Sequence, residues 1–214
     1  MKDLLRTSTS LVEGIENILN LQAKIESDAS NKYLAMAAWL DRNGYANTAS
    51  YLYKQAEEER EHFLKVFKYI TDMGGIAVTP SIPEVQQEFA SLREVFEIAL
   101  QNEIAVTQAV NKVIAKCRAE NDYATEDFMM WYVAEQREEE KNARRALELF
   151  ELINGNEADG NVAAHDIGHA PRHLDGKRHD LLGDLVVERM QRLLQPVGEA
   201  GEPHGFFLGV RRAF

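Results

Sequence analysis

The sequence predicts an all-α fold, an antiparallel four-helix bundle with a long crossover between its second and third helices. Four long segments carry apolar side chains at intervals of three and four residues, which is the period of an amphipathic helix. Short turns separate the first segment from the second and the third from the fourth. Between the second and third segments, residues 74–90 form a longer gap that contains Pro80 and Pro83. We expect a bundle at residues 1–154, followed by an irregular extension at residues 155–214.

The first two predicted helices lie next to each other in the chain. The first begins at the capping-box pattern Ser10-Leu11-Val12-Glu13 and runs to about Asn43, where Gly44 provides a stop signal. The second runs from about Tyr45 to Met73 and ends at Gly74-Gly75. Because almost no linker separates the two helices, they should be antiparallel neighbours.

The gap after the second helix is long enough to return the chain to the other end of the bundle. A helix of about 28 residues is roughly 42 Å long, and some ~16 extended residues can cover that distance. The second and third helices should therefore be parallel. The third begins at a second capping box, Ser91-Leu92-Arg93-Glu94, and runs to Glu120. The fourth begins at Asn121-Asp122 and ends near Asn154-Gly155.

Each predicted helix carries a glutamate near its middle, on the face that is otherwise apolar. These residues are Glu26, Glu59, Glu103 and Glu139. His62 follows Glu59, and Gln136 precedes Glu139, at the spacing of three that places two side chains on one helix face. A buried carboxylate without a positive partner is unfavourable by several kcal/mol or more. Two divalent cations would neutralise the four carboxylates, and oxygen ligands with one imidazole suit iron or manganese better than structural zinc.

Composition excludes several other classes of protein. The formal net charge of −11 argues against nucleic-acid partners and against anionic membrane surfaces. A single cysteine, Cys117, allows no disulfide within the chain and indicates a reducing compartment. Residues 1–10 have no apolar core of the signal-peptide kind, and no apolar run is long enough to span a membrane. We expect a cytoplasmic protein without a membrane partner.

Residues of about 10–153 resemble a bacterial non-haem ferritin. The matching residues are Glu26, Tyr33, Glu58, Glu59, His62, Glu103 and the segment from Trp131 to Lys141. The resemblance implies a ferritin-like homo-oligomer, a cage of 24 subunits unless the extension blocks assembly. It also implies a ferroxidase that oxidises Fe(II) with dioxygen or hydrogen peroxide and stores the product as a ferric mineral.

The same resemblance assigns roles to individual residues. Glu26, Glu59 and His62 match the first of two ferroxidase irons, with Glu59 as the bridge, and Glu103 and Glu139 match the second. Further matches are Gln136 beside the diiron centre, Tyr33 as the nearby tyrosine, and Glu58, Glu135 and Glu138 with Glu139 at a third iron site. Haem is not expected, because Arg60 stands where haem-binding relatives place a methionine. Asp127 matches one acidic position of the cation pore, whereas Met130 occupies the other.

Two alternatives stay open at this point. One is a diiron oxidase or peroxidase of the same superfamily that stores nothing, and the other is a purely structural helical assembly with solvated glutamates. Residues 155–214 depart from the family and hold five of the six histidines. Their segment at about 181–194 is compatible with a short helix, whereas Pro171 interrupts any helix through His165, His169 and His173.

Overall fold

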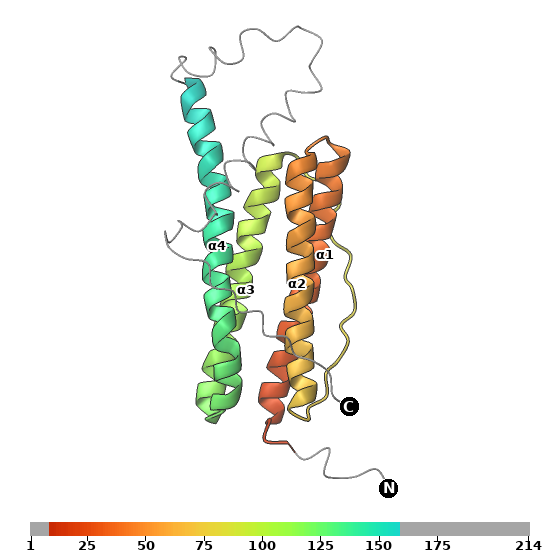
Figure 1. Cartoon of the computed structure of the whole chain (residues 1–214), viewed down its shortest axis with the longest axis vertical. Coiled ribbons are helices and arrows are strands. Elements are labelled where there is room, and N and C mark those ends of the chain that lie inside the picture. The colour runs from red at the N-terminus through yellow and green to blue at the C-terminus, as the bar shows by residue number, and fades with distance from the viewer. Residues whose placement is uncertain (1–8, 159–214) are drawn as a thin grey trace, which may run out of the picture.

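The computed structural model describes residues 9–158, and the side chains of residues 9–151. This part of the chain contains four helices and no strand: α1 (Glu13–Arg42), α2 (Ala46–Asp72), α3 (Leu92–Glu120) and α4 (Tyr123–Ala158). Figure 1 shows α1 beside α2 and α3 beside α4, with the members of each pair running in opposite directions. The predicted all-α four-helix bundle is confirmed.

The crossover after α2 runs along the outside of the bundle beside α1 (Figure 1). It carries the chain from the end of α2 to the opposite end of the bundle, so α2 and α3 point the same way. Asn20 of α1 fastens the start of this segment. Its Oδ1 accepts a hydrogen bond from the Val78 N–H at 2.8 Å, and its Nδ2 donates to the Ile76 carbonyl at 2.9 Å. The predicted crossover is therefore confirmed.

Most helix ends follow the predicted signals. Gly44 and Gly74 adopt φ angles of 86° and 81°, and Asn121 adopts 57°, a left-handed conformation that ends α3. Ser91 caps α3, because its Oγ accepts a hydrogen bond from the Glu94 N–H at 3.1 Å.

Two predicted ends were wrong. The first helix begins at Glu13 with Val12 as its uncapped N-cap, so the capping box predicted at Ser10 does not form. Thr9 organises the turn instead, since its Oγ1 accepts from the Leu11 N–H at 2.9 Å while the Leu11 side chain enters the core. At the other end, α4 continues past Gly155 to Ala158. Glycine weakens a helix but does not by itself end one.

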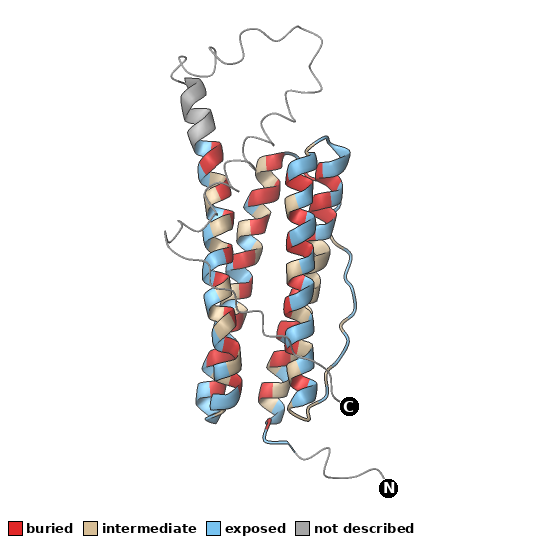
Figure 2. Ribbon diagram, in the orientation of Figure 1, coloured by how far each residue is buried: buried red, intermediate tan, exposed pale blue. Residues whose placement is uncertain are grey.

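The core consists of two apolar clusters, one toward each end of the bundle. Figure 2 shows buried residues along the faces that the helices turn toward one another. The upper cluster joins Tyr33 and the residues after it on α1 to the start of α2, the start of α3 and the end of the described part of α4. The lower cluster joins the start of α1 to the ends of α2 and α3 and the start of α4. Near the middle of each helix, a short stretch of residues belongs to neither apolar cluster.

None of the four helices in the described range is both long enough and apolar enough to cross a membrane. From residue 159 on, the predicted extension lies outside the described residues, and so do its segment at 181–194 and its histidines. The division of the chain at residue 154 stays a prediction.

Candidate metal centre

A layer of buried polar side chains fills the gap between the two apolar clusters. It is built from all four helices, and no member is more than 9% exposed. Its members are Gln22, Glu26, Glu59, His62, Glu103, Gln136 and Glu139. Helical periodicity carries each of them to the inner face, at the level where its helix passes from one cluster to the other.

Three of these residues form a compact cluster between α1 and α2. One ligand atom from each of Glu26, Glu59 and His62 lies within 4.8 Å of the other two. The Nδ1 atom of His62 is 3.3 Å from Oε2 of Glu59 and 4.0 Å from Oε2 of Glu26. Two carboxylate oxygens and an imidazole nitrogen at this spacing are a suitable donor set for one divalent transition-metal ion.

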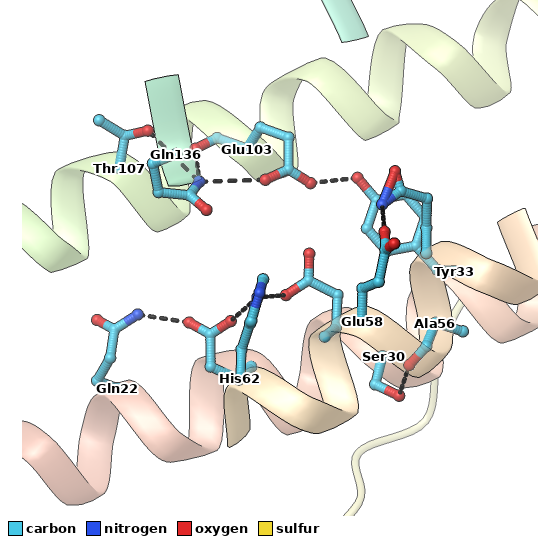
Figure 3. Close-up of polar contacts among 12 residues, drawn as sticks. Gln22, Ser30, Tyr33, Ala56, Glu58, His62, Glu103, Thr107 and Gln136 are labelled. Atoms are coloured by element: carbon cyan, nitrogen blue, oxygen red, sulfur yellow. Dashed lines mark hydrogen bonds and ion pairs between the residues drawn. The ribbon is translucent and has the colours of Figure 1, made fainter. Parts of the chain in front are cut away.

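Glu103 faces this cluster from α3 (Figure 3). The Tyr33 hydroxyl on α1 donates to its Oε1 atom, and the Gln136 amide on α4 donates to its Oε2 atom at 3.1 Å. The same amide lies 3.2 Å from the Glu103 backbone carbonyl. Both carboxylate oxygens therefore have a donor, and these contacts connect three helices at the level of the site. Glu103 itself stands outside the three-residue cluster.

The remaining predicted acidic residues lie at one edge of the layer. Glu139 is buried, Glu135 is half-buried and Glu138 is exposed on α4. Glu58 is half-buried on α2, where it accepts from Gln55 at 2.5 Å and pairs with Lys54 at 3.1 Å. Glu58, Glu135 and Glu138 all raise the pKa of Glu139, so they are close enough to act on its charge. They are not part of the compact cluster.

Burial raises the pKa of every carboxyl group in the layer. The pKa of Glu26 lies well above its ordinary value because of burial and the nearby Glu59. Burial and Glu103 raise the pKa of Glu59 to about 8, and burial, Glu103 and Glu58 raise that of Glu139 to about 8. Burial also raises the pKa of Glu103, although its hydrogen bonds from Tyr33 and Gln136 oppose the rise. Cations that enter the layer would therefore displace protons.

Aromatic rings enclose His62 on the side of α4. The imidazole ring lies 5.4 Å from the Trp131 ring and 5.2 Å from the Tyr132 ring, and these two rings stack at 4.5 Å. The Lys65 ammonium sits 3.3 Å above the centre of the Trp131 ring on the outer side. This packing limits the orientations that the imidazole can adopt.

A small cavity of about 10 Å³ adjoins the layer. Tyr33, Tyr51, Gln55, Glu103 and Glu139 supply its polar lining. That volume is about what one water molecule needs. Solvent can therefore occupy a position beside Glu103 and Glu139 without disturbing the packing.

The two residues matched to a cation pore lie elsewhere, by the turn between α3 and α4. Asp127 and Met130 line a surface depression of about 520 Å³ together with Arg118, Tyr123 and Glu126. The Arg118 guanidinium pairs with Glu126 at 2.8 Å, so Glu126 adds little net negative charge there.

Sequence reasoning did not select two residues that act on Glu26, one in the layer and one beside it. Gln22 donates to Glu26 at 2.5 Å. The fully buried Tyr132 hydroxyl lies close enough to Glu26 to oppose the rise in its pKa, although it has no hydrogen-bond partner of normal geometry among the described side chains. Gln22 was detectable as a polar residue on the apolar stripe, one turn before Glu26. Tyr132 carried no such signal, because a tyrosine on a stripe usually belongs to the core.

Known proteins share much of this sequence. The ferritin-like domain family matches residues 16–153 of the chain. The chain is 40% identical over 131 residues to a non-heme ferritin-like protein of Haemophilus influenzae, which covers 61% of this chain and 79% of that protein. It is 31% identical over 143 residues to the non-heme ferritin of Campylobacter jejuni, covering 67% and 86% of the two chains.

Solved structures give the same result for the fold. The ferritin of Chlorobium tepidum superposes with a TM-score of 0.66 at 36% identity, covering 67% of this chain and 88% of that one. An open-pore ferritin from the archaeon Archaeoglobus fulgidus gives a TM-score of 0.69 at 27% identity, with coverage of 83% and 98%.

Proposed function

The chain belongs to the ferritin-like family, and on that basis we propose that it stores iron and oxidises it. The proposed reaction is ferroxidase activity, the oxidation of Fe(II) to Fe(III) at a diiron site within one subunit. The stored product is a ferric mineral. The proposed ligands of the two ions are Glu26, Glu59, His62, Glu103 and Glu139.

The observation that carries this proposal is the polar layer itself. Four buried carboxyl groups and an imidazole lie on the inner faces of the helices, where apolar side chains would pack more favourably. Within the described side chains, no lysine or arginine forms an ion pair with any of the four carboxylates. Two divalent cations would supply the missing positive charge.

Each residue has a separate part in the proposed reaction. We assign the bridging role to Glu59, which lies 3.3 Å from His62 within the compact cluster and near enough to Glu103 for that carboxylate to raise its pKa. Its carboxylate would hold both ions close enough for each to give one electron to the same oxidant molecule. Carboxylate oxygens also favour the harder Fe(III) product over Fe(II).

Proton movement follows from the raised pKa values. With dioxygen as the oxidant, two Fe(II) ions supply two electrons and two protons are taken up, which gives hydrogen peroxide and two Fe(III) ions. The protons that Glu59 and Glu139 retain near neutral pH are released when iron enters. We propose that Glu58, Glu135 and Glu138, with Glu139, hold a third ion as iron moves from the diiron site to the mineral.

The decisive experiment is replacement of Glu59. Glu59→Ala removes a ligand from both proposed ion positions. Loss of a residue that only hydrogen-bonds a metal ligand typically lowers activity by roughly 10–100-fold, so the initial rate of Fe(II) oxidation should fall by more than that. Stopped-flow absorbance of the ferric product measures this rate. The matched control is Glu61→Ala, an exposed glutamate on the same helix. A parental rate in Glu59→Ala would refute the site.

Two further measurements separate storage from the alternatives. Anaerobic Fe(II) titration should show two or three ions per chain, whereas no binding would rule out both enzymatic functions. The mass of the iron-loaded assembly should correspond to a cage of 24 chains. A dimer that oxidises iron but retains no mineral would instead indicate a non-storing diiron oxidase or peroxidase.

A further inference from the structure

Gln22 is a buried amide whose hydrogen-bonding capacity is only partly used. It lies on the inner face of α1, one turn before Glu26, and is 1% exposed. Its Nε2 atom donates to Oε1 of Glu26 at 2.5 Å (Figure 3). Its own carbonyl oxygen is buried and has no partner among the described residues. Among the described residues, the one hydrogen bond of normal geometry that the side chain makes is therefore with a proposed iron ligand, although the Tyr132 hydroxyl also lies near enough for Gln22 to lower its pKa.

Packing alone does not explain an amide at this position. Leu19 and Ala23, its neighbours along the helix, are fully buried members of the lower apolar cluster. A buried amide with an unpaired carbonyl is unfavourable relative to an apolar side chain of similar volume. Relative to a leucine, a glutamine here adds a donor toward Glu26 at hydrogen-bond distance and a polar group near the Tyr132 hydroxyl, and only the first of these has normal hydrogen-bond geometry.

The contact fixes which oxygen of Glu26 faces the metal cluster. Because Gln22 engages Oε1, the other oxygen, Oε2, points toward Nδ1 of His62 at 4.0 Å. That oxygen is buried and has no hydrogen-bond donor in the described part of the chain. The free oxygen is therefore the one that lies beside Glu59 and His62.

We infer that Gln22 is a positioning residue for iron. It holds the Glu26 carboxylate with Oε2 directed at the first ion, and it sets the affinity of that position without touching the ion. The inference rests on the proposed function, because it concerns the same site. Hydrogen-bond partners that orient ligating side chains set metal affinity in this way in other metal centres.

The second proposed ion position has a different support. Gln136 donates to Glu103 from another helix, whereas Gln22 and Glu26 belong to the same helix. Loss of Gln22 should therefore weaken one ion position selectively. A residue that only supported the fold would weaken both positions together.

The test is anaerobic Fe(II) titration of the full chain by calorimetry, at a pH where the parent binds iron. His62→Ala identifies the binding step of the first ion, because it removes that step. Gln22→Leu should weaken this same step by about 10–100-fold and leave the other step unchanged. Gln136→Leu should show the opposite selectivity. Thr48→Val is the control, because Thr48 is also fully buried and its side-chain oxygen has no partner in the described part of the chain, but it lies outside the polar layer.

A second readout uses Co(II) as the probe. The visible spectrum of the first bound Co(II) depends on the arrangement of its ligands, so it should differ between Gln22→Leu and the parent and remain parental in Thr48→Val. Gln22→Met repeats both measurements with an unbranched side chain, in case the leucine variant fails to fold.

Three outcomes would overturn the inference: first-step affinity within twofold of the parent in either folded variant, an equal loss in both steps, or an unchanged Co(II) spectrum. If the parent itself binds no Fe(II), the proposed function fails instead.

Discussion

Replacement of Glu139 by glutamine should stabilise the metal-free protein, and more so at alkaline pH. Glu139 is 9% exposed, and burial together with Glu103 and Glu58 raises its pKa from 4.5 to about 8. A glutamine of nearly the same shape has no charge to bury. The variant therefore removes an unfavourable ionisation and leaves the surrounding packing in place.

The size of the effect follows from the difference in pKa between the folded and unfolded states. The unfolded chain releases the Glu139 proton near pH 4.5, whereas the folded chain holds it to about pH 8. Between these values the folded state binds more protons, so the free energy of unfolding falls as the pH rises. At 1.36 kcal/mol per pKa unit, ionisation of this group lowers stability by roughly 1 kcal/mol at pH 5 and roughly 4 kcal/mol at pH 8.

Denaturant unfolding of the chelator-treated full chain measures this difference. Parent and Glu139→Gln are compared at pH 5 and pH 8 at one protein concentration, because assembly contributes to apparent stability. Glu148→Gln is the control, since Glu148 is 52% exposed beside Arg145 and its loss should change stability by less than about 0.5 kcal/mol. Equal stabilities of parent and Glu139→Gln at pH 8 would refute the reasoning. With Fe(II) added, the parent should become more stable than Glu139→Gln, because Fe(II) should bind the parent more tightly.

Two further predictions concern the second ion position and the third helix. Tyr33→Phe removes the donor that holds down the pKa of Glu103, so the second Fe(II) should bind severalfold more weakly, with the largest loss at low pH. Anaerobic titrations at two pH values measure the affinity of the second Fe(II), and an affinity equal to that of the parent would contradict the prediction. Tyr53→Phe is the control, because Tyr53 lies on the same bundle but is 37% exposed. Ser91→Ala should lower the free energy of unfolding by about 1 kcal/mol through loss of the helix cap. Chemical denaturation tests it against the exposed Ser50→Ala, and equal stabilities would show that the cap contributes nothing.

The bundle and the inner positions of its acidic residues were predictable from sequence because helical periodicity is local. Glu26 and Glu103 stand out against apolar neighbours three and four residues away, so no knowledge of the partner helices is needed to find them. The crossover was predictable for a similar reason. Its length matches the length of a helix, and Pro80 and Pro83 argue against a fifth helical segment there.

The unpredicted features depend on contacts between distant parts of the chain. Leu11 enters the lower cluster beneath the end of α2, and this packing places the start of α1 beyond the capping box at Ser10. Tyr132 belongs to the site because α4 brings it against His62 of α2. The connection of Tyr33 to Glu103 spans 70 residues of sequence. Periodicity can assign a side chain to the inner face, but it cannot assign its partner there.

The arrangement of the core shows how a layer of buried acidic side chains is held in shape. Apolar packing is concentrated in the two clusters on either side, which keep the four helices in register independently of the charges between them. Within the layer, hydrogen bonds from Tyr33 and Gln136 to Glu103 connect α1, α3 and α4 and need no ion to form. Protons retained at high pKa take the place of cations on Glu59 and Glu139. Iron would then exchange with protons in a pre-aligned site, so the free energy of binding is not spent on assembling the bundle.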